Sequence, residues 1–313
     1  MTWNPETVEN KIGIRFKDKN VLRLALTHSS FATQIGESEQ DNQRLEFLGN
    51  AILNFVVADY LYERCPYLEV SKFSVLRDKL VDGERLTKLW FQIGLGEDLL
   101  LGSGEDWNLL RQKVNGPFKD AFEALLGAMY LDRRFSQTQK WLVKHLIDPV
   151  LEHHLQNLKE RKQPNKQLEF LGNGIINAAV SDYLYRKFPQ IRTGILSTLR
   201  KQLINSQKLA ELKSHLRSED SILLGRESEK IGSLSFKAIL GEVYNYHERS
   251  FSDTCNWFKR FIQEDEVLTL AIPLLLEDGK HKEWIIKKVM GYEGQRYKEG
   301  VERFNQLMER EAS

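Results

Sequence analysis

The chain has 313 residues, of which 41% are hydrophobic and 28% charged, a composition that excludes a fibrous or disordered protein and fits two globular domains. Its formal net charge of +1 argues against a strongly basic nucleic-acid binder but leaves room for a local basic patch. The two cysteines, Cys65 and Cys255, form no disulfide framework, and no apolar run approaches the roughly 18 residues of a membrane span, so we expect a soluble protein of a reducing intracellular compartment.

Two short helical patterns open the chain, at residues 6–17 and 21–28, with the turn and cap residues 18–20 between them. His28, at the end of the second pattern, could serve as a catalytic base or as a cap at the edge of the core. We favour the cap, because no nucleophile or metal ligand stands at a fixed spacing from it. The polar segment 34–42 then predicts a loop.

A long helix is predicted from about Gln43 to Tyr62. Glu46 and Asn50 are four residues apart in it and therefore share one face. Gly49 lies in the middle of this helix, where glycine costs about 1 kcal/mol relative to alanine. Glycine has no side chain and so lets another backbone approach closely, which would offset this cost. We therefore expect a close helix contact at Gly49.

A second helix is predicted over residues 119–132. Asp120 and Glu123 are three residues apart and project from one face, while their apolar neighbours turn to the core. Together with Glu46 they could converge on a divalent cation, because Mg²⁺ prefers hard oxygen ligands. On spacing alone, a solvated or ion-paired helix face is the better explanation of the two acids.

The long helix is repeated in the second half of the chain. The sequence Leu-Glu-Phe-Leu-Gly-Asn stands at residues 45–50 and again at 168–173, and Asp-Tyr-Leu-Tyr at 59–62 returns at 182–185. Both pairs keep an offset of 123 residues, which indicates an internal duplication. The repeat therefore predicts two copies of one domain.

Four stretches of the first copy carry a family signal: Ala-Leu-Thr-His-Ser-Ser at 25–30, Arg-Leu-Glu-Phe-Leu-Gly at 44–49, Leu-Gly-Ser-Gly-Glu at 101–105 and Asp-Ala-Phe-Glu-Ala-Leu-Leu-Gly at 120–127. In order and spacing they resemble the nuclease domain of the ribonuclease III family over nearly all of residues 5–150. The resemblance implies an all-α fold that dimerises through the long helix and cleaves double-stranded RNA by metal-assisted hydrolysis. It also implies that Phe47 and Phe170 lie at the interface between the copies.

The resemblance places the four acids of a family active site at Glu46, Asn50, Asp120 and Glu123. Asn50 departs from the pattern, because the family has an aspartate there and an amide brings no negative charge. Mutating even a residue that only supports a metal ligand typically lowers metal affinity or activity by about 10 to 100-fold. The loss of a direct ligand should lower them at least as much. Glu46, Asp120 and Glu123 could still hold one Mg²⁺ if residual nuclease activity remains.

The second copy departs further from the family pattern. Residues 235–241 align with residues 121–127, which completes the set of site positions. These positions are Glu169, Asn173, Leu234 and Lys237. A leucine cannot bind a cation, a lysine repels one, and a single carboxylate cannot assemble a two-metal site. We expect the second copy to be catalytically inactive.

These observations predict two tandem ribonuclease III-type helical domains, at residues 1–150 and 151–266, and a helical C-terminal extension at 267–313. The two domains should pair within one chain as an intramolecular pseudo-dimer. Whether whole chains also form a homo-oligomer is left open. The valley between them would fit an RNA duplex, which proteins read through phosphates and 2′-hydroxyl groups.

Basic residues in two segments are candidates for contacts with RNA phosphates. They are Lys159, Arg161, Lys162 and Lys166 before the repeated helix, and Lys282, Lys287 and Lys288 in the extension. For residues 280–288 the alternative is a solvated helix with Trp284 and the isoleucines packed on the core.

The pattern favours a protein that binds structured or double-stranded RNA without cutting it and needs no cofactor for binding. Its layout resembles two-domain members of the family from plant chloroplasts, which implies a role in RNA processing such as group II intron splicing. Two alternatives are an active or strand-nicking, Mg²⁺-dependent endoribonuclease that uses the first copy, and a structural component of a ribosome-like ribonucleoprotein. We expect no membrane association, and a location in the chloroplast stroma in a plant or in the cytoplasm otherwise.

Overall fold

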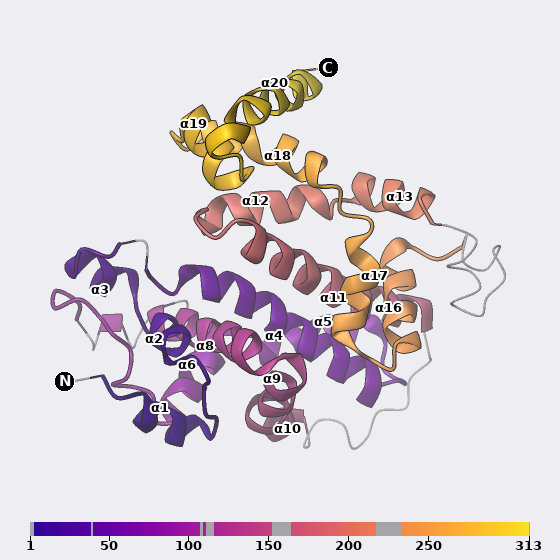
Figure 1. Cartoon of the computed structure of the whole chain (residues 1–313). Coiled ribbons are helices and arrows are strands. Elements are labelled where there is room, and N and C mark those ends of the chain that lie inside the picture. Colours follow the sequence, from indigo (N-terminus) through magenta and orange to yellow (C-terminus); the bar gives the residue numbers. More distant parts are fainter. Residues whose placement is uncertain are drawn as a thin grey trace. The chain divides into compact units, whose positions relative to one another are not determined.

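The computed structural model describes residues 3–38, 40–106, 109–110, 116–151, 164–216 and 233–312. Across these ranges the regular elements are helices, without a β-strand, and Thr27 and Leu100 form one isolated backbone bridge (Figure 1). The predicted all-α fold is confirmed. Within the same part of the chain, no helix combines the length and the apolar character that a membrane span requires.

The chain divides into two compact units, Met1–Ala178 (unit 1) and Ala179–Ser313 (unit 2). The boundary falls inside one long helix, α11 (Pro164–Lys187), so that its first part belongs to unit 1 and its last part to unit 2. The domain limits expected from the sequence were placed by the internal repeat, whereas these two units are defined by their compactness. The expected limits stay a prediction.

Unit 1 is built around α4 (Gln43–Arg64), which packs along α8 (Pro117–Arg133). The other elements of this unit are α1 (Pro5–Ile12), α2 (Lys19–Ala25), α3 (Ser29–Gln34), α5 (Val70–Leu80), α6 (Gly83–Gln92), α9 (Phe135–Leu142), the π-helical turn η1 (Val143–Ile147), α10 (Asp148–Leu151) and the first part of α11. Both α2 and α6 also rest on α8, so the α4–α8 pair is enclosed by shorter helices.

Helix α4 begins after Asn42 and ends at Arg64, just before Cys65 and Pro66, so the long helix expected over about 43–62 is confirmed. Most of its residues are buried, including apolar residues on every side, as is typical of a helix in the centre of a domain. Asp59 is buried with them and accepts a hydrogen bond from Nε2 of Gln139 in α9. Satisfying this buried carboxylate ties α9 to the central helix.

Two glycines set the distance between α4 and α8. A Cβ atom at Gly49 would lie 1.7 Å from the carbonyl oxygen of Glu123, and one at Gly127 would lie 2.3 Å from the carbonyl oxygen of Leu45. Both distances are far below van der Waals contact, so only glycine lets the two backbones come this close. The close helix contact predicted at Gly49 is confirmed. It brings the polar faces of α4 and α8 together.

His28 is the N-cap of α3. Its Nδ1 accepts a hydrogen bond from the backbone N–H of Ser30 at 3.2 Å and lies 2.8 Å from the Oγ of the same residue. Its backbone N–H donates to the carbonyl oxygen of Leu100 at 3.0 Å. The predicted capping role is therefore confirmed, and this histidine stabilises a helix terminus.

The first part of α11 packs on α4 and α5 within unit 1. The Phe170 ring lies 5.3 Å from the ring of Phe73 in α5, in an edge-to-face arrangement. Gln167 is buried, and its Nε2 donates hydrogen bonds to the carbonyl oxygens of Pro66 and Leu68 at 3.2 and 2.8 Å. A Cβ atom at Gly174 would lie 3.1 Å from the Cα of Phe55 in α4, so these helices approach closely too.

Unit 2 holds the last part of α11 and a series of shorter helices. They are α12 (Thr193–Leu203), α13 (Ser206–Ser214), α16 (Phe236–Tyr246), α17 (Phe251–Lys259), α18 (Glu264–Glu277), α19 (Lys282–Trp284), the π-helical turn η2 (Ile285–Val289), the 3₁₀ turn η3 (Gly294–Arg296) and α20 (Tyr297–Ala312). Helix α18 packs against both α12 and α20. Cys255 in α17 and Cys65 after α4 are both free and buried, as the absence of a disulfide framework predicted.

Candidate active site

Three carboxylates meet where α4 and α8 cross, and we call them the acidic cluster: Glu46, Asp120 and Glu123. One carboxylate oxygen of each lies within 4.8 Å of the other two. Glu123 is only 1% exposed, whereas Glu46 and Asp120 are half-buried. Among the described residues this is the one group of three or more acidic, histidine or cysteine side chains that could converge on a metal ion.

Asn50 faces the acidic cluster with a hydrogen-bond donor. Its Nδ2 donates to Oε1 of Glu123 at 2.9 Å. An ionised aspartate has no N–H to offer and would instead repel Glu123 at this distance. The asparagine thus converts a position that the family resemblance assigns to a metal ligand into one that satisfies a neighbouring carboxylate.

Lys119 supplies a positive charge to the acidic cluster. Its Nζ lies 2.7 Å from Oε2 of Glu123 and 3.3 Å from Oδ1 of Asp120. Sequence reasoning assigned no role to Lys119, although its spacing was a usable signal. A lysine directly before one acid and four residues before another reaches both on a helix.

Burial and neighbouring charges shift the pKa values of three side chains in the site. Burial raises the pKa of Glu46 to about 7, and repulsion by Asp120 and Glu123 adds to this. Burial also raises the pKa of Glu123, although Lys119 and Asn50 oppose the effect. Burial alone would lower the pKa of Lys119, but attraction by Glu123 and Asp120 outweighs it and raises that pKa. Lys119 therefore carries its charge at neutral pH.

The second copy places its site residues differently. Glu169 and Asn173 are half-buried in the first part of α11, and the carbonyl oxygen of Asn173 accepts a hydrogen bond from Asn177 at 2.8 Å. Leu234 is 3% exposed just before α16, and Lys237 is half-buried in the first turn of that helix. Neither of these two residues can offer a carboxylate.

Comparison with known proteins shows the relationship of the two copies. The sequence model of the family described as Ribonuclease-III-like matches residues 18–150 and again residues 146–264. The chain belongs to the ribonuclease III family. The two matches follow one another along the chain, which confirms the tandem arrangement that the repeat predicted.

Several bacterial enzymes are similar to the ribonuclease III region of this chain. The Ribonuclease 3 of Pseudomonas fluorescens (strain SBW25) is 40% identical over 174 residues, which cover 55% of this chain and 71% of that protein. The Ribonuclease 3 of Ectopseudomonas mendocina (strain ymp) is 46% identical over 134 residues, which cover 42% of this chain and 55% of that protein. A crystal structure of the ribonuclease III nuclease domain from Campylobacter jejuni is 33% identical, covers 50% of this chain and 100% of its own, and has a TM-score of 0.43.

The side chains at the first ribonuclease III site do not fit a two-metal centre. Such a centre needs oxygen ligands around both cations. Here Asn50 turns an N–H toward Glu123, and the ammonium of Lys119 bonds to the other oxygen of the same carboxylate. The three converging carboxylates could supply ligands for one cation at most. That cation would compete with the ammonium group of Lys119 for them.

We predict that the stability of the protein falls as pH rises from about 5 to 7, measured in EDTA. A carboxyl whose pKa is raised from 4.5 to about 7 on folding binds more protons in the folded than in the unfolded state over this interval. The free energy of unfolding should drop by about 1 to 3 kcal/mol across it. Thermal unfolding of wild type and Glu46→Gln at several pH values checks this. An equally steep fall in Glu46→Gln would contradict it.

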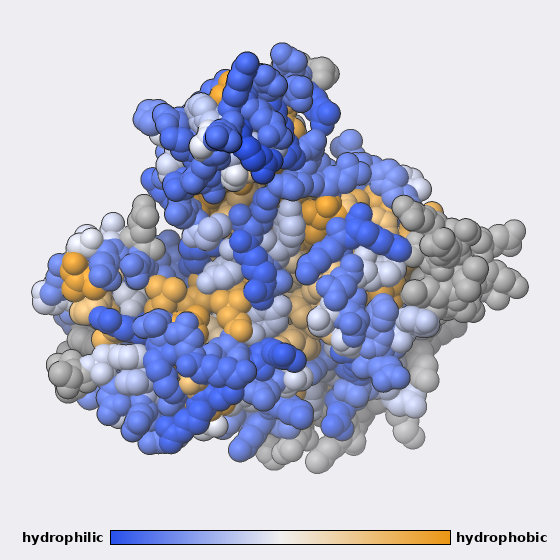
Figure 2. Space-filling model, viewed as in Figure 1, coloured by the Kyte–Doolittle hydropathy of each residue, from blue (hydrophilic) through white to orange (hydrophobic). Residues whose placement is uncertain are grey.

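The candidate RNA-binding lysines of the extension have side-chain partners, and two of them, Lys282 and Lys287, also lie over the rings of Phe304 and Tyr297. Lys287 pairs with Glu283 at 2.6 Å, and Lys288 pairs with Glu293 at 3.1 Å. The Nζ of Lys282 donates to Oδ1 of Asn305 at 2.6 Å. Such pairing supports the alternative of a solvated helix, and Figure 2 shows hydrophilic side chains over this end of the chain.

The other candidates belong to the segment before and within α11. Lys166 is exposed in the first turn of α11. Lys159, Arg161 and Lys162 lie outside the residues that the structure describes. The assignment of these four residues to RNA contacts stays a prediction.

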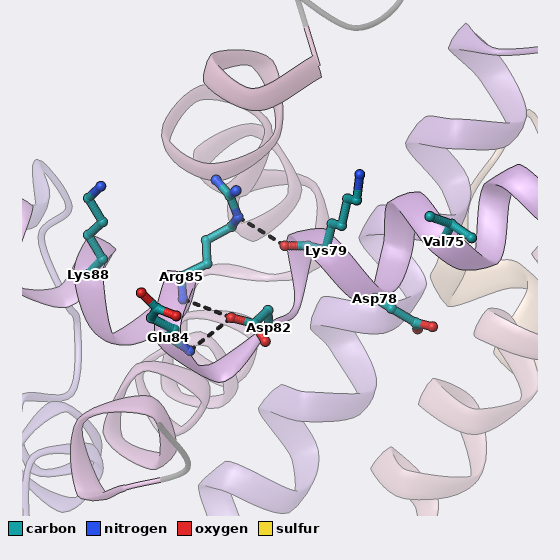
Figure 3. A pocket seen from close by; sticks show the side chains of 7 residues that line it. All are labelled: Val75, Asp78, Lys79, Asp82, Glu84, Arg85 and Lys88. Carbon is teal, nitrogen blue, oxygen red and sulfur yellow. Dashed lines mark hydrogen bonds between the residues drawn. The ribbon is translucent and has the colours of Figure 1, made fainter. Parts of the chain in front are cut away.

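A shallow depression between α5 and α6 was not foreseen from the sequence. It has a volume of about 560 Å³ and is lined by Val75, Asp78, Lys79, Asp82, Glu84, Arg85 and Lys88 (Figure 3). Asp82 caps α6 by accepting the N–H groups of Glu84 and Arg85 at 3.1 and 3.3 Å, and Nε of Arg85 donates to the Lys79 carbonyl at 2.9 Å. The lining residues of this depression carry both positive and negative charges, which indicate no particular ligand.

Proposed function

We propose that this protein binds structured or double-stranded RNA without cleaving it, on a ribonuclease III scaffold. The observation that carries the proposal is the composition of the first site, where an amide N–H and an ammonium group satisfy Glu123. Hydrolysis in the family requires carboxylates that hold metal ions, and the first copy lacks one of them. The second copy retains one carboxylate, Glu169, at its four positions.

The parts of the fold that serve packing are retained. Gly49 and Gly127 keep α4 and α8 in close contact, and Leu-Glu-Phe-Leu-Gly-Asn is present in both copies. Phe170 and Gln167 of the second copy pack on α5 and on the turn after α4 within unit 1. These contacts support a pseudo-dimer formed through the repeated helix, whose valley would hold an RNA duplex by its phosphates and 2′-hydroxyl groups.

We extend the proposal to a role in RNA processing, such as group II intron splicing. Its support is the layout of two tandem copies without complete sets of acids, which resembles two-domain plant chloroplast members of the family. In a plant the chloroplast stroma would be the location. Partner proteins of a ribonucleoprotein particle would then bind the same scaffold.

A second candidate function is that of an active or strand-nicking endoribonuclease. The observation in its favour is the convergence of three carboxylates within 4.8 Å in the first copy. One Mg²⁺ bound there could support attack on one strand. A third candidate, a structural component of a ribosome-like particle, would use protein contacts more than phosphate contacts.

We predict that perfect RNA duplexes stay intact with the protein in Mg²⁺ or Mn²⁺, while binding persists in EDTA. Binding should weaken by about 10³-fold or more between 50 and 200 mM salt if six or more phosphates are contacted. Electrophoretic mobility shifts over a salt series and denaturing gels measure the two properties. Strand-specific nicking that vanishes in Glu123→Ala would favour the nuclease, and a flat salt response would favour protein docking.

A further inference from the structure

We propose that the ammonium group of Lys119 is the resident cation of the acidic cluster and takes the place of a divalent metal ion. This inference deepens the proposed function and rests on it. Lys119 would then neutralise the acidic cluster of the first copy without a metal ion.

The geometry around Glu123 carries the inference. This buried carboxylate has two oxygens, and each meets a donor from the protein itself. Oε1 accepts from Nδ2 of Asn50 at 2.9 Å, and Oε2 accepts from Nζ of Lys119 at 2.7 Å. The same ammonium reaches Oδ1 of Asp120 at 3.3 Å. One side chain therefore bridges two of the three acids, as a bound cation would.

Lys119 differs from a lysine of an ordinary surface ion pair. The side chains of Lys119 and Glu123 are 18% and 1% exposed. In the pair of Glu283 and Lys287, which has the same four-residue spacing, they are 64% and 39% exposed. Exposed pairs gain little because water screens them, whereas a carboxylate as enclosed as Glu123 needs a partner. Lys119 therefore neutralises charge that solvent does not reach.

A divalent cation would have to displace this ammonium. Lys119 is attached to the same helix as Asp120 and Glu123, so it competes at the high effective concentration of a tethered group. Displacement would also leave a lysine without partners beside a cation that repels it. Both effects oppose metal binding, and the Asn50 N–H opposes it further because it takes up the other oxygen of Glu123.

The test compares wild type with Lys119→Met in the full chain, because methionine keeps much of the aliphatic stem and removes the charge. We expect wild type to unfold at the same temperature in EDTA and in millimolar Mg²⁺ or Mn²⁺. Lys119→Met should unfold several degrees lower in EDTA, regain this loss in Mn²⁺, and bind Mn²⁺ about 10 to 100-fold more tightly than wild type. Calorimetric titration measures the affinity.

Lys11→Met is the matched control. Lys11 pairs with Asp98 at a distance of 2.7 Å, and neither residue belongs to the acidic cluster. This variant should gain no response to Mn²⁺, and Glu123→Gln should abolish the response of Lys119→Met. Tight Mn²⁺ binding by wild type that Glu123→Gln removes would overturn the inference even if Lys119→Met failed to fold. Unchanged Mn²⁺ affinity in a folded Lys119→Met would overturn it as well. RNA cleavage by wild type would instead sink the proposed function, so the two failures are distinguishable.

Discussion

Replacing Gly49 by alanine should destabilise the protein by about 3 kcal/mol or more, because the new methyl group meets backbone and not a movable side chain. Its Cβ would lie 1.7 Å from the carbonyl oxygen of Glu123 and 2.8 Å from the backbone nitrogen of Gly127. Helices α4 and α8 would have to separate. The higher helix propensity of alanine returns only about 1 kcal/mol. Thermal and urea unfolding of the full chain measure the loss.

Two further substitutions sharpen this test. Gly127→Ala should destabilise as well, since its Cβ would lie 2.3 Å from the Leu45 carbonyl oxygen. Gly194, in the first turn of α12, has open space around its Cβ position, so Gly194→Ala should be neutral or slightly stabilising. If Gly49→Ala were as stable as Gly194→Ala, α4 and α8 would not cross as closely as the structure shows.

Asn50→Asp should convert the first site from one that its own side chains satisfy into one that depends on a cation. The substitution replaces a 2.9 Å hydrogen bond to Glu123 by repulsion between two carboxylates. We expect a loss of about 2 to 3 kcal/mol in EDTA, seen as unfolding several degrees lower. Mg²⁺ or Mn²⁺ should restore the loss, because a fourth acid adds both charge and a hard oxygen ligand.

Asn54→Asp is the matched control for this experiment. Asn54 stands one turn further along α4 and donates to the carbonyl oxygen of Asn50 at 2.9 Å. Its replacement removes a hydrogen bond of similar length by the same chemical change, so its loss of stability should not respond to Mg²⁺. Equal rescue of both variants would mean that the cation acts elsewhere. Combining Asn50→Asp with Lys119→Met should tighten cation binding beyond either single variant.

Much of the fold follows from patterns that are local in the chain. Apolar spacing located α4, and a mid-helix glycine indicated the close approach at Gly49. The lack of a nucleophile or metal ligand at a fixed spacing from His28 favoured a cap over a catalytic base, and His28 caps α3. The repeat of Leu-Glu-Phe-Leu-Gly-Asn indicated two tandem copies from the sequence alone. Periodicity, capping and repetition are properties of neighbouring residues or of the sequence as text, so they need no tertiary structure.

The sequence by itself determined that the first copy has three acids and an asparagine where the family pattern has four acids, and that the second copy keeps one acid. Only the tertiary structure decided what those residues do to one another. Lys119 and Glu123 are neighbours on one helix, but the Asn50 amide reaches Glu123 because α4 and α8, which are distant in the chain, cross at two glycines. Hydrogen bonds and charges act over a few ångströms in space, whereas spacing along the sequence fixes neighbours within one helix alone.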